Sequence, residues 1–320
     1  MHRDFLLTPR ATMTTPTAPS TAGPGPNGGS AVGITTSSDV ANGIGNFQGQ
    51  PAVFLRSPDG ARATVLLHGG HLVSWVPAGG SEMLYLSPRS SYGGSSAVRG
   101  GVPVVFPQFS ARGPLPRHGF ARNRPWTLLE QSQRGRNAFA VFGLTDDDAT
   151  RAIWPQPFSL ELTVSIEVRR IEIELAVINT GETNLSFHAA LHTYLRCNDV
   201  IKTQLEGLMD RNYLDQTNGE ERNQWVDVVT VAKELDRIYF NAPAGPLTLR
   251  ELGRRLQISQ AGFADTVVWN PGPERCAQLA DMPADGWAEM MCVEAAQIGE
   301  AVTLSPGEEW AGMQTLEAAG

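Results

Sequence analysis

One stretch of the chain, FSLELTVSIEV at residues 158–168, alternates apolar and polar side chains without a break. A period of two residues is the spacing of a β-strand that is buried on one face only. After the dipeptide Arg169-Arg170, the segment IEIELAV repeats the alternation and ends in the turn-like segment NTGETN. The two segments therefore predict a pair of antiparallel strands. The residues that share the apolar face of the first strand are Phe158, Leu160, Leu162, Val164, Ile166 and Val168.

The rest of the chain, from about Pro51 onward, carries the same signal in shorter pieces. The segment AVFLRSPDGARATVLL, residues 52–67, contains two apolar runs separated by Pro-Asp-Gly, which predicts a hairpin. No long stretch combines helical periodicity with caps, and 33 glycines and 22 prolines divide the chain into short segments. We therefore expect an all-β protein, a large sandwich of many antiparallel strands.

The first 45 residues differ from the remainder. They include the segment TMTTPTAPSTAGPGPNGGSAVG, which is rich in Thr, Ser, Pro, Gly and Ala and offers almost nothing to bury. Such a composition is typical of disorder. We expect a disordered tail over residues 1–45 and a single β-sandwich domain over residues 46–320, since no linker or internal repeat divides the latter.

The charge balance and the cysteines limit the classes of partner and compartment. The formal net charge of -8 argues against nucleic acid or an anionic membrane as the main partner. No apolar run is long enough to span a bilayer. The cysteines, Cys197, Cys276 and Cys292, are odd in number and widely spaced, which indicates reduced thiols. We expect a cytoplasmic monomer that acts on a small molecule.

Two histidines occur in the segment NLSFHAALHTYLRC, residues 184–197. Read as one continuous strand, it puts His188, His192, Tyr194 and Arg196 on one face and apolar side chains on the other. That polar face is either solvent-exposed or part of a site, and the pattern leaves both interpretations open. A metal held by His188 and His192 is disfavoured, because four strand residues span about 13 Å, too far for one ion to bridge.

Glu294 lies in an apolar segment, EMMCVEAAQIGE at residues 289–300. Desolvation there would raise its pKa from the usual value of about 4.3 toward neutrality. A general base that acts at cellular pH needs such a carboxylate. The alternative is a structural glutamate at a strand end or one neutralised by an arginine.

Residues 83–129 contain no Asp or Glu in an otherwise acidic chain. Arginine offers a planar, permanently charged donor set that matches phosphate and carboxylate. The close set Arg117, His118 and Arg122, between a proline and a glycine, indicates an anion-binding loop. The arginines that fit the alternative, pairing with acids elsewhere in the fold, are Arg89, Arg112 and Arg124.

Four segments carry a family resemblance: VRGGVPVVFPQFSARGPLPRHGFARNRPW, LHTYLRCNDV, DTVVWNPGPE and MCVEAA. In that order they resemble the signature segments of the glucose-6-phosphate 1-epimerases, which are hexose-6-phosphate mutarotases of the aldose 1-epimerase superfamily. The resemblance implies a galactose mutarotase-like β-supersandwich. It also implies an isomerase that interconverts the α and β anomers of hexose 6-phosphates, glucose 6-phosphate being favoured, with no metal and no organic cofactor.

The resemblance also implies residue roles. The histidine of the LHTY segment is the general acid of the family and the glutamate of the CVE segment is the base, which points to His192 and Glu294. The segments VRGG and HGFAR imply contacts with the sugar phosphate. The substrate-binding residues that we expect are Arg99, Arg117, His118, Arg122, Asp215 of YLDQ and Asp265 of DTVVWNP.

In the family a neutral side chain often occupies the position of Arg117, although the charge of Arg117 suits phosphate.

Three alternatives remain open. The protein could be an aldose mutarotase on free hexoses, a carbohydrate-binding or regulatory protein of the same fold without turnover, or a metal-dependent cupin. Neither the preferred hexose nor the pathway follows from the sequence.

Overall fold

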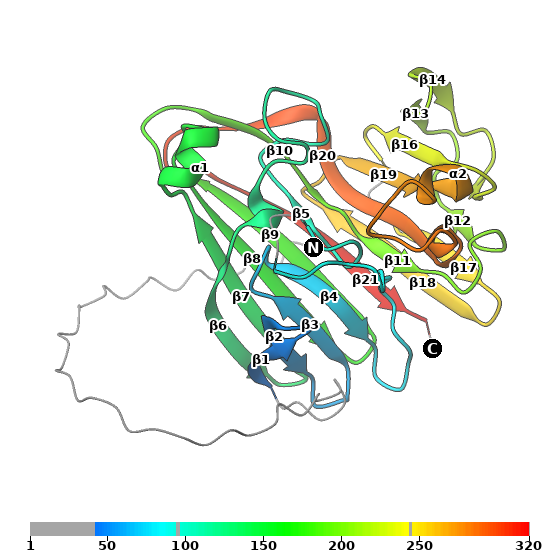
Figure 1. Ribbon diagram of the computed structural model, residues 1–320, viewed down its shortest axis with the longest axis horizontal. Helices are drawn as coiled ribbons and strands as arrows, with labels where there is room; N and C mark the ends of the chain where they lie inside the picture. Colours follow the sequence, from blue (N-terminus) through cyan, green and yellow to red (C-terminus); the bar gives the residue numbers. More distant parts are fainter. Residues whose placement is uncertain (1–41, 94–96, 243–244, 320) are drawn as a thin grey trace, which may run out of the picture. The chain divides into compact units, whose positions relative to one another are not determined.

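The computed structural model describes residues 42–93, 97–242 and 245–319. These residues belong to one compact unit, Ser38–Gly320. Most of the predicted tail, residues 1–41, lies outside the described residues. Strand β1 begins at Gly43, before the tail boundary expected at residue 45. The described part of the chain is built from three sheets, and their named strands pair antiparallel, which confirms the all-β prediction (Figure 1).

The first sheet has four strands in sequence order: β1 (Gly43–Phe47), β2 (Gln50–Arg56), β3 (Arg62–Leu66) and β4 (His71–Val76). The hairpin predicted for residues 52–67 is confirmed, because β2 pairs with β3 from Ala52↔Leu66 to Arg56↔Arg62. Its turn is closed by a hydrogen bond that the Gly60 amide donates to the Ser57 carbonyl, 3.0 Å. Pro-Asp-Gly thus lies at the turn, as its chemistry requires.

The largest sheet has nine strands, and those of them that Figure 1 labels lie side by side there. In spatial order they are β15 (Val228–Val229), β12 (Gln204–Glu206), β17 (Leu247–Glu251), β18 (Arg254–Ala261), β21 (Glu309–Ala318), β9 (Arg170–Asn179), β8 (Phe158–Glu167), β7 (Asn137–Thr145) and β6 (Thr127–Arg134). The predicted pair of alternating strands is β8 and β9, in register from Phe158↔Asn179 to Glu167↔Arg170. Val168 is the exception, since it lies in the turn after β8 with a φ of 33°.

The third sheet has eight strands and includes the segments singled out for their chemistry. Its main path is β14 (Glu220–Asn223), β13 (Asn212–Asp215), β16 (Leu235–Tyr239), β19 (Asp265–Asn270), β20 (Met290–Leu304), β10 (Leu185–Leu191) and β5 (Val104–Val105). Strand β11 (Tyr194–Arg196) also pairs with β20. The main core is shared by apolar residues of this sheet and the nine-stranded one, for example Val293 and Leu162.

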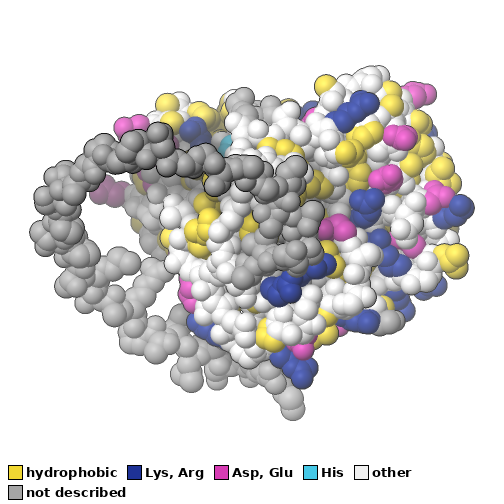
Figure 2. All heavy atoms as spheres, turned by 60° about the horizontal axis from the view of Figure 1, so that its bottom comes forward, with side chains coloured by type: hydrophobic (Ala, Val, Ile, Leu, Met, Phe, Trp, Pro, Cys, Tyr) yellow, Lys and Arg dark blue, Asp and Glu magenta, His cyan; other side chains and the backbone are white. Residues whose placement is uncertain are grey.

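Helices are few and short. They are α1 (Asp148–Ile153), α2 (Gly272–Cys276), and the 3₁₀ turns η1 (Ala121–Asn123) and η2 (Gly286–Glu289). No helix in the described ranges is long and apolar enough to cross a membrane. On the face drawn in Figure 2, acidic and basic side chains are interspersed over the described surface. That face therefore presents mixed charge.

Candidate active site

A cavity of about 210 Å³ lies on the face of the eight-stranded sheet that is turned away from the main core. Strands, loops and α2 all contribute to its wall. The lining residues are Arg99, Phe109, Ser110, Arg117, His118, Arg122, His192, Tyr194, Gln216, Asp236, Val267, Trp269, Arg275, Leu279 and Glu294. The wall thus combines cations, acids, imidazoles and aromatic rings, which is the composition of a small-molecule site.

Strand β20 brings Glu294 to the cavity because its side chains alternate between two faces. Val293 and Ala295 pack in the main core, whereas Cys292 and Glu294 face the other side. The Glu294 side chain is 1% exposed, so the apolar neighbours seen in the sequence do desolvate it. The carboxylate is held in a rigid central strand, with β19 on one side and β10 and β11 on the other.

His192 reaches the cavity from a break in the sheet. The continuous strand expected over residues 184–197 is wrong, because β10 ends at Leu191 and β11 starts at Tyr194. At the break, the His192 amide donates to the carbonyl of Pro103, 3.0 Å, instead of continuing the ladder. His188 does not line this cavity, and it lies in a separate hollow of about 210 Å³ beside Arg112.

His192 and Glu294 meet in the cavity. Nδ1 of His192 lies 3.2 Å from Oε1 of Glu294. Nevertheless, Nδ1 of His192 and Oε2 of Glu294 are buried without a hydrogen-bond partner. Buried polar atoms are rarely left in this state unless a ligand or water completes them. The pair is therefore arranged to receive a polar molecule.

Aromatic rings fix the orientation of the His192 imidazole. The ring stacks on Tyr194 with the centroids 4.8 Å apart and the planes within 9°. Trp269 meets it edge-on at 6.1 Å, and the His118 ring lies 5.4 Å away. The Tyr194 hydroxyl accepts a hydrogen bond of 3.1 Å from Nη1 of Arg99. The stack thus connects the imidazole to the arginines.

Burial shifts the pKa values of Glu294 and His192 in opposite directions. The pKa of Glu294 is raised well above its usual value by burial first and by the charge of Asp236 second, with Arg122 acting against them. The pKa of His192 is lowered by burial and then by His118, Arg122 and Arg99. Both shifts favour the uncharged form of the group concerned.

Three of the six arginines of the acid-free window line the cavity, namely Arg99, Arg117 and Arg122. A fourth cation, Arg275, comes from α2 and was missed because it lies outside the window. The other arginines of the window, Arg89, Arg112 and Arg124, do not line it.

The cavity arginines differ in how much of their charge is already matched. Arg99 is neutralised in part, because its Nη2 lies 3.0 Å from Oδ2 of Asp281. Arg122 donates from Nη2 to the Arg117 carbonyl, 2.9 Å, while its buried Nε has no partner. Burial, then the charges of Arg122, Arg117 and Arg99, lower the pKa of His118 to about 3. A strong positive potential therefore fills this part of the cavity, and an anion would relieve it.

The loop that carries His118 is tied by short contacts. The Ser110 amide donates to Nδ1 of His118, 3.3 Å, and the His118 amide donates to the Ser110 carbonyl, 3.0 Å. Gly119 follows with a φ of 69°, and a Cβ there would lie 2.0 Å from the carbonyl oxygen of Phe106. Only glycine allows the backbone to lie this close to Phe106. The glycine that follows His118 in the motif therefore fixes the position of the His118 side chain.

Two of the expected substrate residues, Asp215 and Asp265, do not line the cavity. On β13, Asp215 shares a face with Tyr213 of the main core, so the next residue, Gln216, is the one that reaches the cavity. The Asp215 carboxylate instead accepts hydrogen bonds from the amide and the hydroxyl of Thr217, 3.0 and 2.6 Å.

Asp265 lies four residues before Trp269 on β19, a separation of about 13 Å along a strand. Its buried carboxylate accepts hydrogen bonds from the backbone amides of Ile298, Gly299 and Asn241, at 2.7, 2.7 and 3.1 Å. These bonds join β19 to β20 and to the segment after β16. The arrangement fits a structural role.

Sequence reasoning missed Asp236. In β16 it lies on the face opposite Leu235 and Tyr239, which pack in the main core, so its carboxylate faces the cavity. There it accepts a hydrogen bond of 2.6 Å from Nε2 of Gln216. Burial raises its pKa to about 6. The signal was an acid inside an apolar alternation, KELDRIYF, which is the same signal that pointed to Glu294.

Among the described residues, one group could bring ligand atoms close enough for a metal ion: His192, Cys292 and Glu294, whose atoms lie within 4.8 Å of one another. Imidazole, thiolate and carboxylate are ligands that Zn²⁺ accepts. However, the neighbouring arginines put positive charge beside the cluster, which disfavours a cation. The cluster therefore suits a cation poorly.

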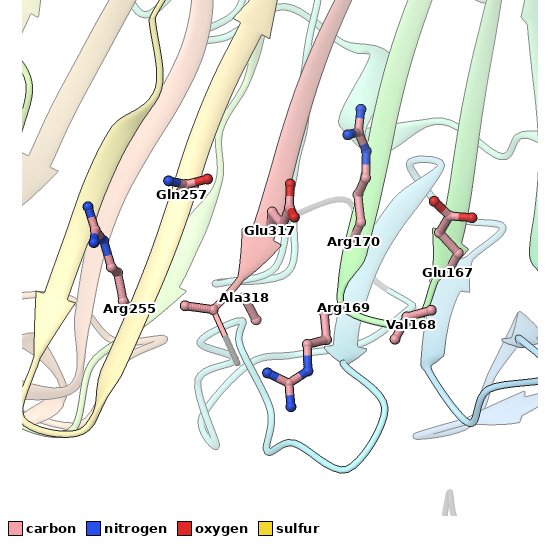
Figure 3. Close-up of a pocket in the computed structure, with 9 residues that line it drawn as sticks. Glu167, Val168, Arg169, Arg170, Arg255, Gln257, Glu317 and Ala318 are labelled. Carbon is pink, nitrogen blue, oxygen red and sulfur yellow. The ribbon is translucent and has the colours of Figure 1, made fainter.

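A larger hollow, of about 530 Å³, lies between the β8–β9 turn and strands β18 and β21 (Figure 3). Arg170, Arg255, Gln257 and Glu317 stand on adjacent strands there and do not converge on one point, while Arg169 extends in another direction. Most of these side chains are exposed and of mixed charge. Size alone therefore does not make it the stronger candidate.

Comparison with known proteins agrees with this geometry. A family model described as aldose 1-epimerase matches residues 51–317. A relative from Escherichia coli strain K12 is 36% identical over 243 residues, 75% of this chain and 81% of its own length. Another relative, from Cenchrus ciliaris, is 31% identical over 280 residues, which are 84% of this chain and 85% of the relative's own length. Both carry the name "Putative glucose-6-phosphate 1-epimerase".

The fold has a close match among solved structures. A crystal structure from Salmonella typhimurium, described as "a putative mutarotase (YeaD)", superposes with a TM-score of 0.80 at 28% identity. The match covers 86% of this chain and 92% of the other. The predicted mutarotase-like sandwich is therefore confirmed, as is the family resemblance.

Proposed function

The chain belongs to the aldose 1-epimerase family, and from that premise we propose that it interconverts the α and β anomers of hexose 6-phosphates, with glucose 6-phosphate favoured. The relatives' names point to that substrate. One observation carries the proposal: an imidazole and a carboxylate 3.2 Å apart share a cavity with Arg99, Arg117 and Arg122. The pair suits ring opening, and the arginines suit a phosphate.

The proposed reaction uses proton transfer alone. Glu294 takes the proton of the anomeric hydroxyl while His192 gives a proton to the ring oxygen. The bond between C1 and the ring oxygen breaks, and C1 becomes an aldehyde. Rotation about the C1–C2 bond presents the other face of the carbonyl. Reversal of both proton transfers then closes the ring as the opposite anomer, so no atom is gained or lost.

The remaining groups of the cavity suit recognition of the sugar phosphate. Arg117 and Arg122 form the part of the wall with the least neutralised charge, and we assign the phosphate to them, with Arg275 nearby on α2. Arg99 supports the site through Asp281 and Tyr194. Asp236 suits a sugar hydroxyl, because a carboxylate accepts hydrogen bonds from such groups.

The setting that we propose is cytoplasmic, since the described cysteines are free and buried. Reduced thiols are usual there. We keep the expectation of a monomer and of a small-molecule substrate without nucleic acid. These points do not bear on the reaction itself.

The proposed function is tested by measuring anomer interconversion of glucose 6-phosphate with a coupled enzyme that consumes one anomer only. We expect a kcat/KM for glucose 6-phosphate at least tenfold above that for glucose. Equal values would favour the rival activity, a mutarotase on free hexoses. Binding of the sugar phosphate without any acceleration would instead indicate a non-catalytic carbohydrate-binding protein.

A further inference from the structure

A buried glutamine, Gln108, lies two residues before the segment that carries Arg117 into the cavity. We call this segment, residues 110–117, the strap. In the described ranges the strap lies outside every strand and helix. Most of its residues are exposed, Arg117 included, whereas Gln108 is only 3% exposed. The position of the strap therefore depends on contacts other than those of a sheet or a helix.

The Gln108 side chain makes three hydrogen bonds to the strap. Its Nε2 donates to the carbonyls of Ser110 and Leu115, 3.0 Å each, and its Oε1 accepts from the Leu115 amide, 2.9 Å. The side-chain amide thus pairs with both backbone polar groups of Leu115, as a neighbouring strand would. Both donor hydrogens of Nε2 are used in these bonds. Gln108 does not line the cavity, so its amide serves the strap.

The strap joins two of the arginines that we assign to the phosphate. Arg117 is its last residue, and the Arg117 carbonyl accepts a hydrogen bond of 2.9 Å from Nη2 of Arg122. Both arginines line the cavity. A displaced strap would therefore move Arg117 and leave the Arg122 guanidinium without this partner.

The catalytic pair is held by other parts of the fold. Glu294 lies within β20, and the His192 amide is fixed by the carbonyl of Pro103. The backbone just after the strap is fixed separately, by the bridge between Phe106 and Gly119. Movement of the strap should therefore affect the phosphate more than the proton-transfer groups.

We propose that Gln108 is a positioning residue of the phosphate site, because its side-chain amide fixes the strap and thereby places Arg117 and Arg122 for the 6-phosphate. The inference rests on the proposed function for the identity of the substrate. It gives a role in substrate selection to a residue that does not line the cavity.

Gly113, within the strap, offers a second way to disturb the same contact. A Cβ on Gly113 would lie 2.4 Å from Oε1 of Gln108, which is closer than such atoms approach. In Gly113→Ala either the side-chain amide or the strap must therefore shift. Because Gly113 is exposed, this variant puts the fold at little risk.

The main test compares Gln108→Met with Gln131→Met. Methionine is unbranched and uncharged, so it removes the three hydrogen bonds without placing a charge beside the arginines. Gln131 is a matched control, since its Nε2 donates to the backbone carbonyl of Phe54, 2.9 Å, and it does not line the cavity. If Gln108→Met does not fold, Gly113→Ala decides.

Limited proteolysis follows the strap without any sugar. Trypsin cuts after arginine, so cleavage at Arg112 or Arg117 gives new amino termini at residues 113 or 118. We expect this cleavage to be about tenfold faster or more in Gln108→Met and Gly113→Ala, because the open form of the strap is more populated. Gln131→Met should be cut at the wild-type rate. Unchanged cleavage in both strap variants would overturn the inference.

Steady-state kinetics show whether the strap places the arginines. In both strap variants we expect KM for glucose 6-phosphate to rise about tenfold, the loss of one charged hydrogen bond. The kcat for glucose 6-phosphate and the kcat/KM for glucose should stay near the wild-type values. A merely structural role would lower activity on both sugars equally. That result, or an unchanged KM in a strap that trypsin cuts faster, would overturn the inference.

The outcomes separate this inference from the proposed function. If the wild type does not accelerate anomerisation of glucose 6-phosphate, the proposed function fails. The dissociation constant for inorganic phosphate, measured by calorimetry, then replaces KM. About tenfold weaker binding in Gln108→Met supports the positioning role, and equal binding contradicts it. If the wild type is active and the strap variants behave like it, the inference alone is refuted.

Discussion

Nδ1 of His192 lies 3.2 Å from Oε1 of Glu294, although the two residues belong to motifs that are far apart in the chain. The contact exists because β20 pairs with both β10 and β11, so the break between those strands faces Glu294. The cavity arginines flank this contact. The account of function depends on these two relationships.

Replacement of Arg117 tests the phosphate assignment with little risk to the fold, since this side chain is exposed. In Arg117→Gln we expect KM for glucose 6-phosphate to rise about 10- to 100-fold, because a charged hydrogen bond contributes about 1.5–3 kcal/mol. The kcat/KM for free glucose should stay near the wild-type value. The measurement is steady-state kinetics of Arg117→Gln with glucose 6-phosphate and with glucose. The control is the variant Arg112→Gln, whose substituted residue lies outside the cavity. Equal losses on both sugars would remove Arg117 from the phosphate site.

Tyr194 tests whether ring stacking orients the acid. Tyr194→Phe keeps the ring that stacks on His192 and loses only the hydroxyl that accepts from Arg99. Tyr194→Leu loses both. We expect kcat to fall more in the leucine variant, by about tenfold beyond the phenylalanine variant, as a misplaced catalytic group costs rate. Similar kcat values for the two variants would contradict the positioning role.

Replacement of Asp265 tests whether this residue binds substrate, as the resemblance implies, or has the structural role that its hydrogen bonds fit. In Asp265→Asn an amide replaces one acceptor oxygen, so at least one of the three backbone amides that it binds loses its partner. We expect a loss of about 1–3 kcal/mol in the free energy of unfolding for each such amide. The KM for glucose 6-phosphate should change little. A large KM increase at unchanged stability would instead restore Asp265 to the substrate site.

His71 gives a pH dependence with a definite sign. Burial lowers its pKa to about 4 from the ordinary 6.5, and its Nε2 contacts the carbonyl of Gly100 at 2.7 Å. Between those two pH values the unfolded chain binds a proton that the folded protein does not, so stability decreases as the pH falls. The wild type should lose about 1.4 kcal/mol more per pH unit than His71→Gln below about pH 6.

Urea unfolding of the wild type and His71→Gln at pH 7.5, 6 and 5 measures this difference. Both proteins share every other titrating group, so those contributions cancel in the comparison. Parallel stability curves would mean that His71 is not held neutral.

Much of the fold follows from local sequence. The period-two pattern of residues 158–168 predicts β8, and Pro-Asp-Gly predicts the turn between β2 and β3. Val168 falls outside the pattern because the chain already turns there. The pairing of strands that are far apart in the chain depends on tertiary contacts. The strand order of the eight-stranded sheet could therefore not be predicted from the sequence.

The site was predictable where burial and chemistry coincide in sequence, as at Glu294. His192 was found, but the strand break that aims it was not, since the break depends on the Pro103 carbonyl from another segment. The sequence motif pointed to Asp215, whereas Gln216 lines the cavity, because neighbouring strand residues face opposite sides of the sheet. Nothing in the sequence around Arg275 indicates that it lines the cavity, because only the placement of α2 in the fold brings it there.

The most direct test of the central claim is the anomerisation rate of glucose 6-phosphate with Glu294→Gln. The amide has nearly the shape of the carboxyl group and carries no charge into the buried position, so the fold and the thermal midpoint should be retained. We predict a fall in kcat of about 10²- to 10⁴-fold, the usual contribution of a general base. A folded Glu294→Gln protein with a rate close to that of the wild type would contradict the account.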